Sequence, residues 1–231
     1  MLEASETHMS ANSLGGAGVP APAFVTGVVL CGGRSRRMGL DKARLELADE
    51  PLLERAARVL SPLAREVVIA CGPEPRYAEL GFRLALDGEG VDGPLAGLAA
   101  GLEAAGTEWV LALACDMPRV RTEDCRSLLA HAKAHGAEGS DVCVYASARG
   151  VEPLCAVYRA TCLAPMRAAL ADGERRATGF WDLRTADGRP LAIERLQVEL
   201  GPDDAVVSDM LVNLNTPEDL ARERHRQGGD A

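Results

Sequence analysis

Short apolar segments of strand length recur along the chain, separated by amphipathic segments of helical length. Apolar runs without polar alternation are typical of strands that are buried on both faces of a sheet. On this basis we predict six strands, at residues 24–31, 66–71, 82–86, 109–115, 141–145 and 154–158.

Helical periodicity fills the intervals between these strands. A helix is predicted over residues 51–64, with Pro51 at its first position, and others over 94–105 and 124–135. Thr122 is a candidate N-cap for the third of these helices. A last helix should start after the N-cap Thr216, with a proline and two carboxylates in its first turn, and run to about residue 226.

The alternation of strands and helices predicts the fold class. It implies βαβ units, and therefore a mostly parallel sheet covered by helices on both faces. We predict a single three-layer doubly wound α/β domain over residues 24–227, since no internal repeat or linker interrupts that stretch. Residues 1–23 are rich in Gly, Ala and Pro and should form a flexible tail. We interpret part of it as a cloning remnant, with Met9 as the natural start.

Composition excludes several classes of function. The 231 residues include 25 Lys or Arg and 34 Asp or Glu, a net charge of −9, so a protein that coats nucleic acid polymers is not expected. Since 47% of the residues are hydrophobic, we expect a soluble globular protein. No apolar run approaches the length of a membrane span and no signal peptide is evident. Seven cysteines without a C-x-x-C pair disfavour a disulfide framework or a zinc site and favour the cytoplasm.

The loop after the first predicted strand carries most of the functional information. Residues 30–42 contain three glycines, and residues 34–44 hold five basic side chains against Asp41, a local charge of +4. Glycines let the backbone pass close to a ligand, and exposed amides in such a turn bind anions. The spacing fits neither a Walker loop nor a dinucleotide-binding fingerprint. We predict a site for a phosphate-rich small molecule; a solvated arginine loop is the alternative.

Two carboxylates follow predicted strands. Asp116 comes directly after the apolar run 109–115, and Asp87 follows 82–86. Ligands of open parallel sheets bind at the carboxyl ends of the strands, where the glycine-rich loop also lies. Mg²⁺ takes one or two protein carboxylates together with phosphate and water oxygens, so the pair suggests Mg²⁺ bridging to nucleotide phosphates. Each aspartate could instead be a helix cap or a turn former.

Several strings resemble those of one known family. The loop L-C-G-G-R-S-R-R-M-G-L-D-K-A at residues 30–43 is similar to the signature loop of the molybdenum cofactor guanylyltransferase family, within the Rossmann-like nucleotidyltransferases. Further matches follow in family order: residues 93–97 (GPLAG), 115–118 (CDMP), 152–153 (EP, before a strand), 173–176 (GERR) and 213–218 (NLNTPE). The resemblance extends from about residue 25 to 222.

The resemblance implies the activity and the nucleotide site. It implies transfer of GMP from GTP to molybdopterin with release of pyrophosphate, Mg²⁺ bound by Asp116, and Asp87 in contact with the nucleotide. The catalytic residues would be Lys42, as a point charge on the triphosphate, Arg37, as a fork on phosphate oxygens, and Asp116. Backbone contacts to base and phosphates would come from Leu30, Cys31, Gly32 and Gly33. The terminal phosphate of the acceptor is already largely ionised near neutrality, so its attack on the α-phosphate of the nucleoside triphosphate needs no strong base.

The acceptor side carries less information. Arg175 and Arg176 resemble a second phosphate-binding stretch of the family, and Asn213 and Asn215 lie in a loop expected to face the pterin. An exposed charge pair and a helix cap are equally good interpretations of these two places. Where family members often place an asparagine beside the nucleotide, at the end of the second strand, this chain has Ala70-Cys71.

Other functions remain open from the sequence. Cytidylyl transfer to molybdopterin and nucleotidyl transfer to a sugar or alditol phosphate share this fold, although Gly32-Gly33 fits the guanylyl branch better than the cytidylyl one. A non-catalytic protein that binds nucleotide or cofactor is a different class, as is a purely structural Rossmann-like domain. For the enzyme, we expect transient contacts with other cofactor-synthesis proteins and apo-molybdoenzymes.

Overall fold

A computed structural model provides the structure of the chain. It describes residues 24–32, 41–88, 90–134, 140–148, 150–198 and 210–228. The tail predicted for residues 1–23 lies outside the described residues, as do Gly33 and Arg37 of the glycine-rich loop.

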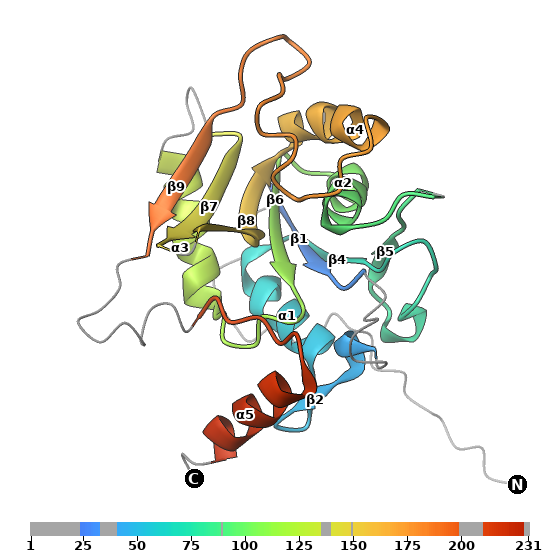
Figure 1. The fold of residues 1–231 in the computed structure, drawn as a ribbon, viewed down its shortest axis with the longest axis vertical. Coiled ribbons are helices and arrows are strands. Elements are labelled where there is room, and N and C mark those ends of the chain that lie inside the picture. Colours follow the sequence, from blue (N-terminus) through green and yellow to red (C-terminus); the bar gives the residue numbers. More distant parts are fainter. Residues whose placement is uncertain are drawn as a thin grey trace, which may run out of the picture.

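A seven-stranded sheet forms the centre of the fold (Figure 1). Its order is β5-β4-β1-β6-β8-β7-β9, and β8 runs antiparallel to both of its neighbours while the other pairings are parallel. The strands are β1 (Val25–Leu30), β4 (Glu66–Ala70), β5 (Arg83–Ala85), β6 (Trp109–Ala114), β7 (Val142–Ser147), β8 (Gly150–Arg159) and β9 (Ile193–Gln197). The predicted three-layer α/β fold with a mostly parallel sheet is confirmed.

Helices cover both faces of this sheet. Helices α1 (Leu52–Leu60) and α3 (Thr122–Ala134) pack on one face, and α2 (Pro94–Ala104) and α4 (Leu163–Ala171) on the other. The last helix, α5 (Pro217–Gly228), lies apart from both layers (Figure 1). Its Leu220 packs with Leu214 against a small hairpin of β2 (Glu46–Leu47) and β3 (Glu50–Pro51). The cap of α5 is as predicted, because the Thr216 hydroxyl accepts the Asp219 N–H at 3.1 Å.

Small residues let α2 approach the sheet closely. The helix consists almost entirely of Leu, Ala and Gly, and its Leu95, Leu98 and Leu102 side chains are buried. A Cβ atom added at Gly101 would lie 2.6 Å from Cγ1 of Val28 in β1, whereas one at Gly97 would lie 3.5 Å from Leu30. The close packing of α2 on the Val28 side chain of β1 therefore depends on the glycine at 101.

Three local predictions were wrong. The helix predicted over 51–64 ends at Leu60 and continues as a 3₁₀ turn, Ser61–Leu63, because Pro62 cannot donate an α-helical hydrogen bond. Thr122 does not cap α3, since its hydroxyl donates to the Val59 carbonyl and Asp124 accepts the Arg121 N–H instead. The pair 152–153 lies inside β8, next to a shift of register against β7, where a proline without an N–H is tolerated.

Several elements were not predicted, namely α4, β9, the β2–β3 hairpin and the remaining 3₁₀ turns, Lys42–Arg44 (η2), Ala78–Leu80 (η4) and Ala160–Cys162 (η5). Strand β9 lies at the edge of the sheet and, among the described strands, pairs only with β7. It is polar along much of its length (IERLQ) and lacks the apolar run that marks a buried strand. All seven cysteines are buried free thiols. No helix among the described residues is long and apolar enough to cross a membrane.

The close contact at Gly101 yields a prediction on stability. We expect Gly101→Ala to lower the free energy of unfolding by about 1–3 kcal/mol, because the added methyl overlaps the buried Val28 side chain. Gly97→Ala in the same helix is the matched control and should be neutral or stabilising by up to about 1 kcal/mol. Urea unfolding of the three proteins measures both values; equal effects at the two positions would contradict the packing argument.

Candidate functional site

The candidate site lies at the carboxyl ends of the central strands. Strand β1 is flanked by β4 on one side and β6 on the other, and Leu30 is level with Ala70 and Ala114. The chain leaves β1 toward one half of the sheet and returns in the other half, which makes this edge the topological switch point where such sheets bind ligands. Residues 31 and 32, which follow β1, and Asp87 and Asp116, which follow β5 and β6, all lie at this edge, as predicted from the sequence.

Three predicted residues meet at the end of β6. The Lys42 Nζ donates to Oδ2 of Asp116 at 3.1 Å and to Oδ1 of Asn215 at 3.0 Å. Both ends of the ion pair are partly buried, with side-chain exposures of 18% and 20%. An ammonium group has three N–H donors, and among the described residues two of them have partners. The third is therefore left for a ligand. The sequence predicts Asn215 on the acceptor side, and in the structure it also contacts Lys42.

Local structure brings these three side chains together. Lys42 begins the η2 turn, which is capped by the Asp41 carboxylate accepting the Ala43 N–H at 3.2 Å. The backbone after β6 is tied to the segment before α5, because the Leu214 N–H donates to the Asp116 carbonyl at 2.8 Å. The packing of α5 against the β2–β3 hairpin thus holds Asn215 near Lys42.

A second carboxylate lies beside this group. Asn213 Nδ2 donates to Oε2 of Glu152 at 3.3 Å, and the other oxygen of Glu152 accepts the Leu154 N–H at 3.1 Å. Burial raises the pKa of Glu152, and the negative charge of Asp116 adds to the shift. In the sequence, Glu152 belongs to one of the strings that resemble the family, and no role was predicted for it. The antiparallel pairing of β6 with β8 places it next to Asp116, and this pairing is visible only in the structure.

Asp87 lies on the opposite side of the switch point. In the sheet order, β4 and β1 separate β5 from β6, so Asp87 and Asp116 follow strands about 14 Å apart. Binding of one Mg²⁺ ion by both carboxylates stays a prediction. Oδ1 of Asp87 is buried and accepts no hydrogen bond from any described residue. Burial raises the pKa of Asp87 to about 6, although the charge of Arg76 partly opposes the shift.

The backbone between these two carboxylates is shaped by glycines. A Cβ at Gly32 would lie 3.1 Å from the Gly72 N atom, so the chain after β1 passes against the chain after β4. At the place where an asparagine was expected, the Cys71 thiol is buried and directed to the Glu74 carbonyl at 3.3 Å. The predicted nucleotide residues Leu30, Cys31 and Gly32 lie at this crossing.

Arg175 and Arg176 occupy a different part of the same edge. The Arg175 carbonyl accepts the Leu95 N–H at 3.2 Å, which fixes this segment against the start of α2, and its guanidinium donates to two backbone carbonyls. Arg176 is 80% exposed and pairs with Glu174 at 2.6 Å. Neither side chain contacts Lys42, Asp116 or the Asn213–Asn215 loop among the described residues. Their role toward an acceptor phosphate stays a prediction.

Two residues of the site were missed by the sequence analysis. Arg76 donates from Nη2 to the carbonyls of Cys31 (3.3 Å) and Cys71 (2.8 Å), and so joins the ends of β1 and β4. Tyr77 donates its hydroxyl to both oxygens of Asp41 at 2.7 and 2.8 Å. An Arg-Tyr pair in a loop carries no motif of its own, and only the proximity of the β4–β5 loop to η2 reveals it.

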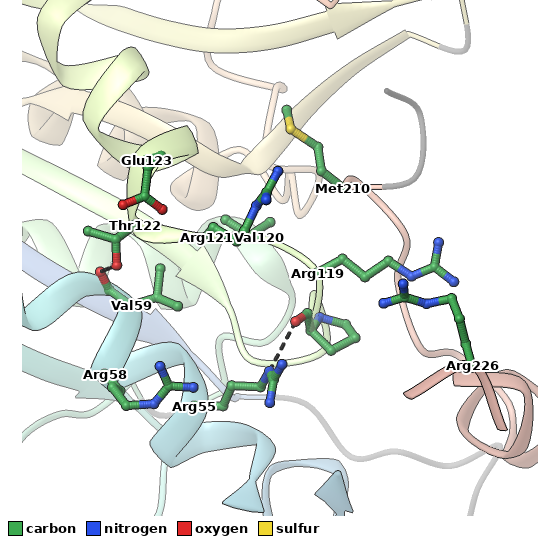
Figure 2. A pocket seen from close by; sticks show the side chains of 11 residues that line it. Arg55, Arg58, Val59, Arg119, Val120, Arg121, Thr122, Glu123, Met210 and Arg226 are labelled. Atoms are coloured by element: carbon green, nitrogen blue, oxygen red, sulfur yellow. Dashed lines mark hydrogen bonds between the residues drawn. The ribbon is translucent and has the colours of Figure 1, made fainter. Parts of the chain in front are cut away.

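A groove of about 520 Å³ beside the site is also rich in arginine (Figure 2). Its basic residues are Arg55, Arg58, Arg119, Arg121 and Arg226. Glu50 bonds to both Arg55 and Arg58, and Glu223 to both Arg119 and Arg226, so acidic partners offset much of the positive charge. The predicted site residues that the structure describes do not line this groove. We therefore do not assign the nucleotide to it.

Comparison with known proteins is consistent with this geometry. A family model described as a MobA-like NTP transferase domain matches residues 27–186. A probable molybdenum cofactor guanylyltransferase of Pelotomaculum thermopropionicum is 34% identical over 199 residues, which cover 86% of this chain and 91% of the relative. The probable molybdenum cofactor guanylyltransferase of Chloroflexus aggregans is 36% identical over 213 residues, with coverages of 87% and 94%.

A solved structure shows the same similarity in three dimensions. The crystal structure of molybdopterin-guanine dinucleotide biosynthesis protein A from Archaeoglobus fulgidus matches with a TM-score of 0.71 at 25% identity. The match covers 88% of this chain and 99% of that protein.

The raised pKa of Asp87 predicts a pH-dependent effect of its replacement by asparagine. An aspartate titrates near pH 4 in an unfolded chain and, at this position, at about 6 in the folded protein. Stability is therefore lost as the pH rises from 4 through 6, because the folded state must then carry a buried charge. Asp87→Asn carries no such charge, so its stability relative to wild type should increase from pH 4 to pH 7. Urea unfolding across this range measures the difference, and a pH-independent one would refute the assignment.

Proposed function

The chain belongs to the molybdenum cofactor guanylyltransferase family of MobA-like NTP transferases, and we propose on that premise that it transfers GMP from GTP to molybdopterin. The products are a molybdopterin guanine dinucleotide and pyrophosphate. The observation that carries the proposal is the ammonium of Lys42 held between Asp116 and Asn215 at the switch point. The relatives bearing the guanylyltransferase name align along nearly their whole length, which supports the same substrates here.

The reaction needs little beyond orientation and charge neutralisation. An oxygen of the acceptor's terminal phosphate attacks the α-phosphorus of GTP, and the bond from that phosphorus to the β-phosphate oxygen breaks. The attacking phosphate is largely ionised near neutral pH, so no side chain has to remove a proton. The ammonium of Lys42, with one donor available, would neutralise charge on the triphosphate. Arg37, outside the described residues, would serve the same purpose.

The residues present fit a magnesium ion that depends on substrate oxygens. Within the described part of the chain, no three His, Cys, Asp or Glu side chains form a metal-binding group. Mg²⁺ commonly takes only one or two carboxylates and completes its shell with phosphates and waters. Asp116 would hold the ion. Lys42 bonds to its Oδ2, which leaves Oδ1 for the metal, and the side chain is partly exposed. Bound there, Mg²⁺ would supply Lewis-acid neutralisation of the phosphates.

The nucleotide would occupy the opposite side of the switch point. Backbone groups of Leu30, Cys31 and Gly32 border the crossing at which the phosphates and base would lie. Oδ1 of Asp87, buried and without a partner in the described part of the chain, is an acceptor that a nucleotide hydroxyl or amino group would satisfy. The acceptor would then approach from the side of Asn213 and Glu152. Transient docking of cofactor-synthesis proteins and apo-molybdoenzymes, and a cytoplasmic location, are part of this proposal.

The two lysines of the chain offer a matched test of the catalytic assignment. Lys42→Ala should reduce turnover about a hundredfold or more, because it removes the charge placed on the triphosphate. Lys133→Ala, at the other lysine, in α3, should keep full activity. Pyrophosphate release measures turnover, and thermal melting checks that both variants fold. Near-normal turnover of folded Lys42→Ala protein would exclude the role.

A nucleotide panel separates the candidate functions. Molybdopterin is incubated with the protein, Mg²⁺ and each nucleoside triphosphate in turn, and the dinucleotide formed is identified by mass. We expect the guanine dinucleotide with GTP and no product when EDTA removes the metal. A cytosine dinucleotide would indicate a cytidylyltransferase. Binding of GTP without pyrophosphate release would indicate a non-catalytic nucleotide carrier, and unchanged turnover in EDTA would refute the metal requirement.

A further inference from the structure

Tyr77 is buried in the loop between β4 and β5, far in sequence from the glycine-rich loop. Its side chain is 2% exposed, and its hydroxyl donates to Oδ1 and Oδ2 of Asp41 at 2.7 and 2.8 Å. Burial, together with this hydrogen bond, raises the pKa of Tyr77 well above that of a free phenol. The hydroxyl therefore remains a proton donor to the two Asp41 oxygens.

The backbone of Tyr77 is held in an unfavourable conformation. Its φ of 69° places a bulky residue in the left-handed region, where only a few per cent of non-glycine residues occur. Such strain persists only where the surroundings determine the conformation, and it concentrates at functional sites. The guanidinium carbons of Arg44 and Arg76 lie 5.3 and 5.2 Å from the ring centroid, so two cations fix the ring.

Asp41 connects Tyr77 to the catalytic lysine. Its Oδ1 accepts the Ala43 N–H at 3.2 Å and caps the η2 turn, in which Lys42 is the first residue. A cap at this position fixes where the Lys42 side chain leaves the backbone, and its Nζ then reaches Asp116 and Asn215. Without the Tyr77 hydroxyl, the Asp41 carboxylate would be held in the cap only by the Ala43 N–H and by the longer contacts with Arg44 (3.8 Å) and Arg76 (3.7 Å).

Arg76 connects the same tyrosine to the nucleotide side. Its guanidinium rests on the Tyr77 ring and donates to the carbonyls of Cys31 and Cys71, and its Nη1 lies 3.7 Å from Oδ2 of Asp41. One buried aromatic side chain thus braces the η2 turn and the exit of β1 together.

We propose that Tyr77 is a positioning residue for nucleotidyl transfer, which acts through Asp41 to hold Lys42 in its productive place. The inference rests on the proposed function, because it requires Lys42 to act on the triphosphate. Tyr77 itself touches no reacting atom. Its contribution should therefore appear only while Lys42 is present.

A double-mutant cycle tests this dependence. Tyr77→Phe removes only the hydroxyl and should lower kcat about tenfold, since small displacements of a catalytic group slow a reaction by one to two orders of magnitude. The KM for GTP should change less than about threefold, because the backbone contacts to the nucleotide remain. In the Lys42→Ala background, the same substitution should cause no further loss, measured as dinucleotide formed over long incubations. A tenfold loss in both backgrounds, or a near-normal kcat of Tyr77→Phe alone, would overturn the inference.

Two further variants keep the test decisive. Tyr145→Phe is the matched control: Tyr145 is also buried, in β7, but its hydroxyl donates to the Asp124 carbonyl, and its loss should leave kcat unchanged. If Tyr77→Phe does not fold, Asp41→Ala carries the same cycle, because it removes the cap from the other end. If Lys42→Ala lowers turnover strongly and Tyr77→Phe causes its full loss in that background as well, only the positioning role of Tyr77 is refuted. Normal turnover of Lys42→Ala refutes the proposed role of Lys42 itself.

Discussion

The contact of Lys42 with Asp116 and Asn215 is the interaction around which the site is organised. It joins residues that are 74 and 173 positions apart in the chain. Each residue is positioned by a different element: Lys42 by a capped 3₁₀ turn, Asp116 by the end of a buried strand, and Asn215 by the segment before the last helix. The seven-stranded sheet provides a common edge for all three, and α5 closes the group from outside the two main helical layers. If any of these supports moved, the ammonium would lose a partner within hydrogen-bonding distance.

The ion pairs that individual side chains form describe the charge at the site better than the net charge of the chain does. The net charge of −9 says little about the site, where one ammonium and one carboxylate are held 3.1 Å apart. Arginines elsewhere on the same side are tied to Glu50 and Glu223, each of which holds two of them. A phosphate-bearing ligand would therefore find these arginines already paired with carboxylates of the described part of the chain. Lysine suits the central position because its compact charge has three donors that can be divided between protein and ligand.

Most strands and the first three helices were predictable because their signals are local. Apolar runs such as 109–115 must be buried, whatever the rest of the fold does, and the Thr216 cap depends on residues three positions apart. Strand β9 and the β2–β3 hairpin escaped prediction because pairing with neighbours, and not hydrophobicity, defines them. The same distinction explains the site. The glycine-rich loop and Asp116 carry motifs, whereas Tyr77 and Arg76 do not.

The sequence by itself determined the layered α/β architecture, the edge of the sheet at which a ligand is expected, and the residue types gathered there, because periodicity and strand ends are properties of neighbouring residues. The tertiary structure alone decided which of them touch. Strand order separated Asp87 from Asp116, two carboxylates that follow strands in the same way, and Oδ1 of Asp87 is buried without a hydrogen bond from any described residue. It also brought Asn215 to Lys42 and Tyr77 to Asp41, since contacts across 173 and 36 residues depend on how strands and helices pack.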